Sequence, residues 1–397
     1  MILANRSRPS VLRKASEGAA VLFGLCLIAF AAMMTEHWVI IHFPPDYFPP
    51  YSWIENVVRA VRLVLLIAGI SLIFFVRRQT GSMLRSAFRS AWILPAAATI
   101  VAIILALVAA EFILRSSGWQ SVVSGDMRRE PLRIRDRTLG WVLKPSHTGY
   151  LVTGGRRIQY ANNVFGYREA DQNIVPDFAR PTIVLAGESV MGGFGLKWDE
   201  TVSARVGRLT NTQTVDLSVG GYSTDQIYLR LKSELPRFQR PVAVVILFSP
   251  MLFRRNLEDG RPHLGPDLLP RPAVDRPELV NIVRWAIPYR SVAKTDRAIL
   301  TTRAILISAV RFAKSRGAIP IVLVPQFVPE SAAERLIRSR VLENVDLPVV
   351  SVPLDGNWRL PGDWHPDACA ASAVATAIVR YLHAEVKWMP RVDSNHD

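Results

Sequence analysis

Apolar residues follow two different patterns along this chain. Before about residue 115 they form long runs, from Ala19 to Ile41, from Leu63 to Val76 and from Ala91 to Ala110. After that, short apolar runs alternate with stretches of helical periodicity. A helix needs roughly 20 apolar residues to cross the hydrocarbon core of a membrane. The sequence therefore predicts three transmembrane helices, at about 17–41, 57–76 and 91–114, followed by an extramembrane part.

Basic residues predict how these helices are oriented, because Lys and Arg are retained on the cytoplasmic side. Segment 42–56 has none, whereas such residues precede the first run and fill the loop after the second: Arg6, Arg8, Arg13, Lys14, Arg77, Arg78, Arg85 and Arg89. The chain is thus expected to be a multi-pass protein of the cytoplasmic (inner) membrane, with a cytoplasmic amino terminus and everything after about Leu114 outside. A cleaved signal peptide is a competing interpretation of the first run.

The second part of the chain has the pattern of an α/β domain. Five apolar runs have strand length: 181–186, 214–219, 242–248, 319–324 and 347–352. Helical stretches separate or follow them: 200–209, 224–235, 291–316, 330–342 and 366–385. Strands that alternate with helices indicate a parallel sheet covered on both faces. The expected fold is a three-layer α/β/α domain with a five-stranded parallel, flavodoxin-like sheet.

The same change of pattern sets the expected domain boundaries. We expect a membrane anchor over 1–115, an extracytoplasmic lead-in over 116–179, a catalytic-type domain over 180–390 and a tail over 391–397. Gly154-Gly155 lies between β-prone runs and predicts a hairpin within the lead-in. Segment 251–285 is rich in proline and lacks periodicity, so we expect an irregular insertion there.

Charge and cysteine content exclude some classes of function. The formal net charge is +15, but the basic residues are scattered, and an extracytoplasmic domain is not expected to bind nucleic acid. Two cysteines exclude a disulfide-dense scaffold and a Cys-based zinc site. One of them, Cys369, lies on the last expected helix, where we expect it to be buried.

Residues that could carry chemistry follow three of the expected strands. Ser189 comes directly after the first strand, Gly220-Gly221 after the second, and Asp363 and His365 after the fifth. Reactive groups gather at the carboxyl ends of strands in open α/β sheets. A serine there needs a base such as His365 to remove its proton, and Asp363 could orient that imidazole. Roles as helix caps for Ser189 and Asp363, and as a structural loop residue for His365, are the alternatives.

These three segments resemble the blocks of the SGNH (GDSL-like) hydrolase family. Gly187-Glu188-Ser189 is similar to its first block, 216–222 to its second, and Asp363-Trp364-His365-Pro366 to its last. Segment 136–168 is similar to the lead-in of membrane-tethered members. The resemblance implies ester hydrolysis or acyl transfer with Ser189 as nucleophile, His365 as base and Asp363 as its orienting partner. It also implies oxyanion stabilisation by the N–H groups of Ser189 and Gly221, and neither a metal nor an organic cofactor.

The third block departs from the family pattern. The family has an oxyanion-binding Asn after the third strand, but this chain has Pro250 there. Proline has neither an amide side chain nor an N–H, and losing one oxyanion donor costs on the order of 100- to 1000-fold in rate. Ser249 and Asn256 are candidates to replace the missing donor.

The resemblance implies a membrane-anchored esterase or acyl transferase. Its expected partners are the lipid bilayer and an ester of a cell-envelope carbohydrate or lipid-linked substrate. The alternative is an accessory or non-catalytic glycan-binding protein that works with a polytopic acyltransferase in envelope polysaccharide modification.

Overall fold

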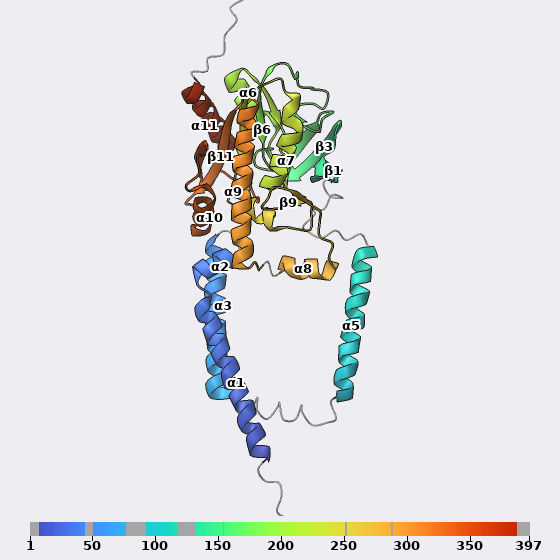
Figure 1. Ribbon diagram of the computed structural model, residues 1–397, viewed down its shortest axis with the longest axis vertical. Helices are drawn as coiled ribbons and strands as arrows, with labels where there is room; N and C mark the ends of the chain where they lie inside the picture. Colours follow the sequence, from blue (N-terminus) through green and yellow to red (C-terminus); the bar gives the residue numbers. More distant parts are fainter. Residues whose placement is uncertain are drawn as a thin grey trace, which may run out of the picture. The chain divides into compact units, whose positions relative to one another are not determined.

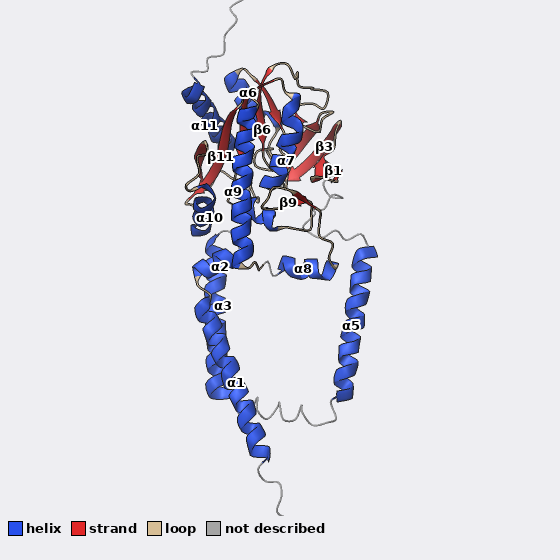
Figure 2. Cartoon of the chain, in the orientation of Figure 1, coloured by secondary structure: helices blue, strands red, loops and turns tan. Residues whose placement is uncertain are grey.

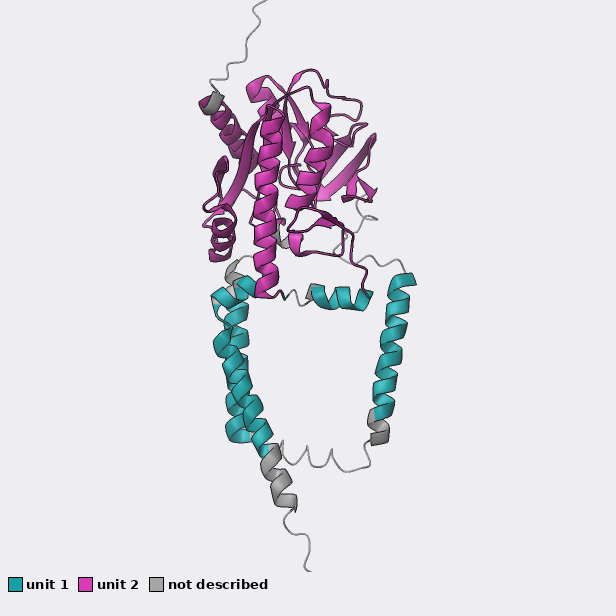
Figure 3. Ribbon diagram, in the orientation of Figure 1, with its two compact units in different colours: residues 1–43, 49–119, 277–289 teal, residues 44–48, 120–276, 290–397 magenta. Residues whose placement is uncertain are grey.

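The computed structural model describes residues 8–43, 51–76, 93–116, 132–153, 155–250, 252–286 and 289–386. They fall into two compact units, which Figure 3 colours separately. The first unit contains the N-terminal helices together with segment 277–289. The second contains the remaining strands and helices. Segment 277–289 thus groups with the N-terminal helices although it lies far along the sequence.

Two helices of the first unit, α1 (Arg8–Met33) and α3 (Tyr51–Ser71), pack through small residues. The unit also contains α2 (Glu36–His42), the π-helical η1 (Leu72–Val76), α5 (Ile93–Ser116) and α8 (Glu278–Ala286). A Cβ on Gly24 of α1 would lie 2.8 Å from the carbonyl oxygen of Gly69 in α3, and the reverse distance is 2.7 Å. Glycine at both positions therefore lets the two backbones touch. Arg62 Nε adds a hydrogen bond of 3.0 Å to the Ala31 carbonyl.

Two described helical stretches, Asn56–Phe75 and Ala97–Ser116, are long and apolar enough to cross a membrane. Glu17–Met33 is apolar but shorter. The predicted continuous span over 17–41 is wrong, because the helix ends at Met33 and α2 begins anew at Glu36. The break occurs where the Thr35 hydroxyl accepts a hydrogen bond from the Trp38 amide and caps α2. Residues 1–7, 44–50 and 77–92, where most of the charge argument for orientation falls, lie outside the described residues.

Helix α8 is a second difference from the prediction, which has no helix within 251–285. The carboxylate of Glu111, on α5, accepts hydrogen bonds of 2.9 and 3.0 Å from the amides of Glu278 and Leu279. This carboxylate satisfies amide groups that the first turn of a helix leaves without partners. Farther along, the Tyr289 ring stacks on His42 with ring centroids 4.9 Å apart. Segment 277–289 is therefore tied to the N-terminal helices by specific contacts.

The second unit is built on an eight-stranded sheet with the order β12-β11-β8-β6-β7-β5-β4-β3. Figure 2 shows these strands in red. Five of the strands are parallel: β6 (Pro181–Ala186), β7 (Gln213–Asp216), β8 (Arg240–Leu247), β11 (Ile319–Val328) and β12 (Val349–Asp355). They are the five predicted strands, and their order is the flavodoxin-like one. The strand that precedes Ser189, β6, lies between β7 and β8.

The lead-in extends this sheet with antiparallel strands, which the prediction of five strands did not include. They are β3 (His147–Thr153), β4 (Arg156–Asn162) and β5 (Arg168–Glu169). The hairpin predicted at Gly154-Gly155 is confirmed, since Thr153 pairs with Arg156. The lead-in joins the parallel strands where Arg168 pairs with Asp216 of β7. A separate hairpin consists of β1 (Arg133–Asp136) and β2 (Gly140–Leu143).

Helices cover both faces of the parallel strands, as predicted. Contacts group α6 (Val202–Thr210) with α11 (Ala368–Val386), and α7 (Thr224–Glu234) with α9 (Val292–Ser315) and α10 (Ala332–Leu342). Figure 1 shows α7 and α9 in front of the sheet. Short 3-10 turns lie at Trp198–Glu200 (η4) and Leu235–Arg237 (η5). Serine N-caps start α9 and α10, where Ser291 and Ser331 accept backbone amide hydrogen bonds.

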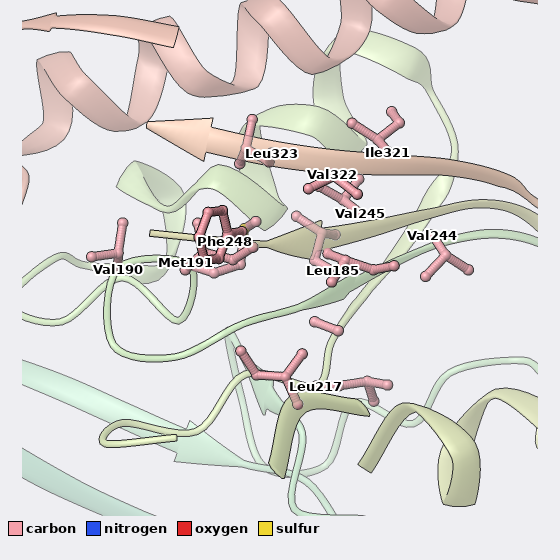
Figure 4. Packing of buried hydrophobic residues seen from close by; sticks show 14 of the residues in the cluster. Leu185, Val190, Met191, Leu217, Val244, Val245, Phe248, Ile321, Val322 and Leu323 are labelled. Carbon is pink, nitrogen blue, oxygen red and sulfur yellow. The ribbon is translucent and has the colours of Figure 1, made fainter. Parts of the chain in front are cut away.

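The core lies between these layers. Consecutive residues of the central strands are buried on both faces, as expected for strands with helices on either side. Figure 4 shows side chains from β6, β8 and β11 packing together, among them Leu185, Val245 and Leu323. Each such side chain contributes roughly 2 kcal/mol by leaving water. The core therefore holds the strand ends, and the turns that follow them, in fixed positions.

The remainder of segment 251–285 has little regular structure. It contains η6 (Leu252–Leu257) and the two-residue strands β9 (His263–Leu264) and β10 (Pro270–Arg271). Arg261 anchors it, since its guanidinium lies 3.0 Å from the Asp225 carboxylate near the start of α7 and both side chains are buried. Arg261 compensates the Asp225 charge, and although burial alone would raise the pKa of Asp225, these contacts hold it below its ordinary value.

Candidate active site

Ser189 lies in a tight turn directly after β6. Gly187 precedes it, and a Cβ there would lie only 2.5 Å from the Met191 Cβ, so the turn needs glycine at this point. The turn closes through backbone hydrogen bonds from Gly192 to Glu188 (2.8 Å) and from Phe194 to Ser189 (2.8 Å). Buried Val190 and Met191 anchor it in the core (Figure 4). The serine is thereby presented at the carboxyl end of the central strand.

His365 and Asp363 lie beside this serine. The Nε2 atom of His365 is 2.9 Å from Ser189 Oγ, and its Nδ1 atom is 2.6 Å from Asp363 Oδ1. The loop is fixed locally, because the His365 amide also donates to Asp363 (2.9 Å) and its carbonyl accepts from the Leu360 amide (2.9 Å). The structure therefore brings Ser189 together with two residues of a distant loop, in the order hydroxyl, imidazole and carboxylate.

The charges of this group suit proton transfer from the serine. Burial by itself would raise the pKa of Asp363, but the hydrogen bonds from the backbone and ring of His365 hold it below its ordinary value. Asp363 is then an anion that accepts Nδ1–H, which leaves the lone pair of Nε2 facing the serine hydroxyl. The side chains of His365 and Asp363 are 15% and 19% exposed, so a substrate can reach the base.

Phe194 packs on the base. Its ring centroid is 4.2 Å from that of His365, with an interplanar angle of 31°. Phe194 belongs to the same turn as Ser189, so one short segment positions the hydroxyl and also supports the imidazole. This contact restricts the orientation of the ring without using either of its nitrogens.

Two lead-in side chains form hydrogen bonds with the same turn. The guanidinium of Arg168 donates to the carbonyls of Gly192, Gly193 (2.7 Å) and Leu196 (2.6 Å). It is buried and lies over the Tyr160 ring at 3.8 Å. Tyr160 donates to the Gly193 carbonyl (3.0 Å) and accepts from the Gly195 amide (2.7 Å). Side chains of β4 and β5 thus satisfy the carbonyls of Gly192, Gly193 and Leu196 and the amide of Gly195.

Glu188, at the family's usual Asp position, makes contacts that the sequence did not predict. Its buried carboxylate accepts hydrogen bonds from the Val190 amide (3.0 Å) and from the amide and hydroxyl of Ser189. The extra methylene of Glu lets the carboxylate fold back over its own turn. The Ser189 N–H, which was predicted to stabilise the oxyanion, therefore donates its hydrogen bond to Glu188 in this structure. The hydroxyl has one proton, so Glu188 and His365 compete for it.

The Gly220-Gly221 peptide lies next to the serine. A Cβ on Gly220 would lie 3.9 Å from the Ser189 Cβ, which places this loop against the nucleophile. Within the part of the chain that the structure describes, the Gly221 amide donates to no protein acceptor. It is therefore open to a ligand, as the resemblance implies for an oxyanion donor.

The two candidates to replace the missing Asn have different environments. Asn256 donates through Nδ2 to the hydroxyls of Thr224 and Thr302 (2.7 Å to the latter), and these bonds use both of its amide hydrogens. No contact brings Asn256 to Ser189 among the residues described here. Ser249 is buried two residues after β8, and its carbonyl accepts a hydrogen bond from the Leu252 amide. Pro250 is also buried.

Two buried carboxyl groups lie near the junction of β5 and β7. Burial raises the pKa of Asp216 to about 6, and it raises that of Glu169 to about 8 with a smaller contribution from the charge of Asp216. Burial likewise lowers the pKa of Arg168. Sequence reasoning missed Glu169 and the role of Tyr160, and it assigned no role to Asp216 or Arg168, although they lie at the ends of segments 216–222 and 136–168. Cys369, expected to be buried, is exposed. In the described segments, no group of three or more His, Cys, Asp or Glu could hold a metal ion.

No protein-family model and no curated protein matches this chain. Solved structures with partial similarity include a lipolytic protein of the G-D-S-L family from Desulfitobacterium hafniense, at 13% identity and a TM-score of 0.34, over 50% of this chain and 98% of that one. An acetyl xylan esterase from Butyrivibrio proteoclasticus matches at 12% identity and 0.34, over 54% and 66%. A family two carbohydrate esterase from Clostridium thermocellum, in complex with cellohexaose, matches at 14% and 0.36, over 54% and 67%. At these TM-scores the similarity assigns no activity to this chain.

Proposed function

We propose that this protein is a membrane-anchored, SGNH-like serine esterase or acyl transferase. Its substrate class would be an acyl ester of a cell-envelope carbohydrate or lipid-linked molecule. One observation carries the proposal. At the end of the central strand, the His365 ring lies within hydrogen-bonding distance of both Ser189 Oγ and the Asp363 carboxylate. The two helices of spanning length support the membrane anchor.

The reaction would proceed in two steps, acylation of Ser189 and then deacylation. Ser189 Oγ attacks the ester carbonyl while His365 Nε2 takes the hydroxyl proton, and the Gly221 amide stabilises the resulting oxyanion. The intermediate collapses, His365 returns the proton to the departing alcohol, and the acyl group remains on Ser189. Water or an acceptor hydroxyl then attacks this acyl-enzyme by the same route, which gives hydrolysis or transfer. Asp363 holds the ring and stabilises the imidazolium formed in each step.

A fluorophosphonate probe tests the nucleophile directly. The full-length protein in detergent should be labelled, and Ser189→Ala should abolish labelling, whereas Ser233→Ala on the exposed side of α7 should not. His365→Ala should slow labelling by roughly 1000-fold or more, because an unassisted serine is a poor nucleophile. His383→Ala, at an exposed position of α11, is the matched control. Labelling that persists in Ser189→Ala would overturn the assignment.

The proposed location can be tested with Cys369. This side chain is exposed, so a membrane-impermeant maleimide should label it in intact spheroplasts if the domain lies outside the cytoplasm. Cys369→Ser should remove that signal. Labelling that appears only after the membrane is broken would place the domain inside.

A second candidate function is accessory glycan binding without catalysis, beside a polytopic acyltransferase. Buried Pro250 favours it, because the third strand end offers no amide side chain to an oxyanion. In that case the wild-type protein would show no ester turnover, and Ser189→Ala would bind glycan as well as the wild type does. Ester turnover that Ser189→Ala abolishes would exclude it.

A further inference from the structure

The carbonyl oxygen of Gly220 accepts hydrogen bonds from two side chains of the lead-in hairpin. Arg133 Nη1 lies 2.8 Å from it, and Trp141 Nε1 lies 3.0 Å from it. The two residues come from β1 and β2, which pair as an antiparallel hairpin. Both donors therefore reach the same backbone oxygen from one small, hydrogen-bonded unit.

This carbonyl belongs to the same peptide group as the Gly221 N–H. A trans peptide is planar, and its N–H points away from its C=O. Two donors that hold the carbonyl oxygen therefore also fix the direction of the Gly221 N–H. One of the donors is a guanidinium, and a charge-assisted hydrogen bond to the carbonyl withdraws electrons from the amide nitrogen. The Gly221 N–H becomes a stronger donor as a result.

The surrounding packing prevents this peptide from rotating. Gly221 has φ +87°, and a Cβ there would lie 3.1 Å from the Trp141 ring and 3.2 Å from Arg133 Nη1. Trp141 is buried, with 5% exposed, and its own carbonyl accepts the Tyr222 hydroxyl at 2.7 Å. The guanidinium of Arg133 lies 5.6 Å from the centre of the Trp141 ring.

We propose that Arg133 and Trp141 are positioning residues that aim and polarise the Gly221 N–H toward the oxyanion. The inference rests on the proposed function and deepens it. It gives a physical reason why this site can work with Pro250 at the third strand end and with the Ser189 amide held by Glu188. The hairpin that precedes the sheet is then part of the active site, although neither side chain touches the substrate.

The test compares full-length Trp141→Phe and Arg133→Met with the wild type on para-nitrophenyl acetate and its thionoester analogue. Trp141→Phe keeps an aromatic ring at this position and removes the N–H donor together with part of the indole volume. Each variant should lower kcat on the oxygen ester about 10-fold, the value of one such hydrogen bond, with KM changed by less than about twofold. Arg133→Lys should recover part of the loss. Arg135→Met, at an exposed position of β1, is the control.

The thionoester separates positioning from general damage. Its sulfur is a weak hydrogen-bond acceptor, so the variants should lose much less rate on it than on the oxygen ester. Equal losses on both esters, or rates equal to those of the wild type, would overturn the inference alone. Absence of wild-type turnover and of fluorophosphonate labelling would overturn the proposed function, and this inference with it. Thermal unfolding of each variant shows whether the hairpin still packs.

Discussion

The two strand ends that flank Ser189 are built differently. After β7, the Gly220 carbonyl is held by two side-chain donors and the Gly221 amide is open to a ligand. At the end of β8, Leu247 and Phe248 are fully buried, and the Phe248 amide donates to the Leu323 carbonyl at 2.8 Å. Pro250 follows and brings no N–H at all. The β7 end offers an open backbone N–H, whereas the β8 end has buried apolar residues, Ser249 and a proline without an N–H.

The difference follows from the neighbours of each strand. Beside β7 lie the lead-in strands, which bring the buried residues Arg168 and Glu169. Beside β8 lies β11, whose Leu323 and Val324 are apolar and buried. The polar half of the site thus depends on a segment outside the parallel sheet. A catalytic-type triad on an α/β sheet does not by itself supply the oxyanion donors.

The largest expected effect is that of Gly221→Ala. A side chain at φ +87° is strained, and its Cβ would press on Trp141 and Arg133, so the peptide must rotate away from its present direction. Loss of the proposed oxyanion donor should lower kcat on para-nitrophenyl acetate on the order of 100- to 1000-fold.

Gly317→Ala is the matched control for backbone strain. Gly317 has φ +76°, and a Cβ there would meet no atom within 4 Å, at a position far along the chain from the site. It should lose roughly 1 kcal/mol of stability and keep its activity. If Gly221→Ala is as active as Gly317→Ala, the β7 end does not provide the donor.

A smaller effect should appear in the pH dependence of stability on the β7 side. Burial raises the pKa of Glu169 to about 8, so the folded protein keeps a proton that the unfolded chain releases at lower pH. That contribution to stability is full below the ordinary Glu value and is lost as pH rises through about 8. Glu169→Gln should lack this contribution. The unfolding free energy of the wild type, measured relative to that of the variant, should therefore fall by about 2 kcal/mol between pH 6 and 8.

Chemical denaturation of the full-length chain, followed by tryptophan fluorescence, measures this slope. Asp171→Asn changes an exposed carboxyl close to Glu169 in sequence and serves as the control. A wild-type slope that persists unchanged in Glu169→Gln would show that this carboxyl does not hold its proton in the folded state.

Apolar patterning was sufficient for much of this architecture. The five parallel strands are runs that only a sheet covered on both faces can bury, and Ser189, Asp363 and His365 follow strands whose ends must meet at one edge. The hairpin at residues 154–155 had its own glycine signal. These features depend on local composition and on one topological rule, so they could be read from the chain.

The supporting contacts could not be predicted in the same way. Arg133 acts on a carbonyl 87 residues away, and a backbone oxygen has no signature in the sequence. Glu188 resembles the family's Asp, yet its longer side chain folds onto the Ser189 amide. Helix α8 begins where Glu111, far away in sequence, caps it. In each case a distant or flexible partner decides the structure.

The most direct way to change the contrast between the strand ends is Pro250→Asn. Strand β8 pairs with β6 up to Ala186 and Ile246, so residue 250 follows closely on a neighbour of the Ser189 turn. An amide there would add a second donor and should raise kcat about 10-fold, equivalent to about 1.4 kcal/mol.

Pro250→Ala is the matched control, because it restores the backbone N–H without a side-chain donor. The gain should be larger in an Arg133→Met background, since both ends would then serve one oxyanion and their effects would not add. Equal rates for the Asn and Ala variants would mean that the β8 end does not face the reacting carbonyl, and that the β7 end stabilises the oxyanion without it.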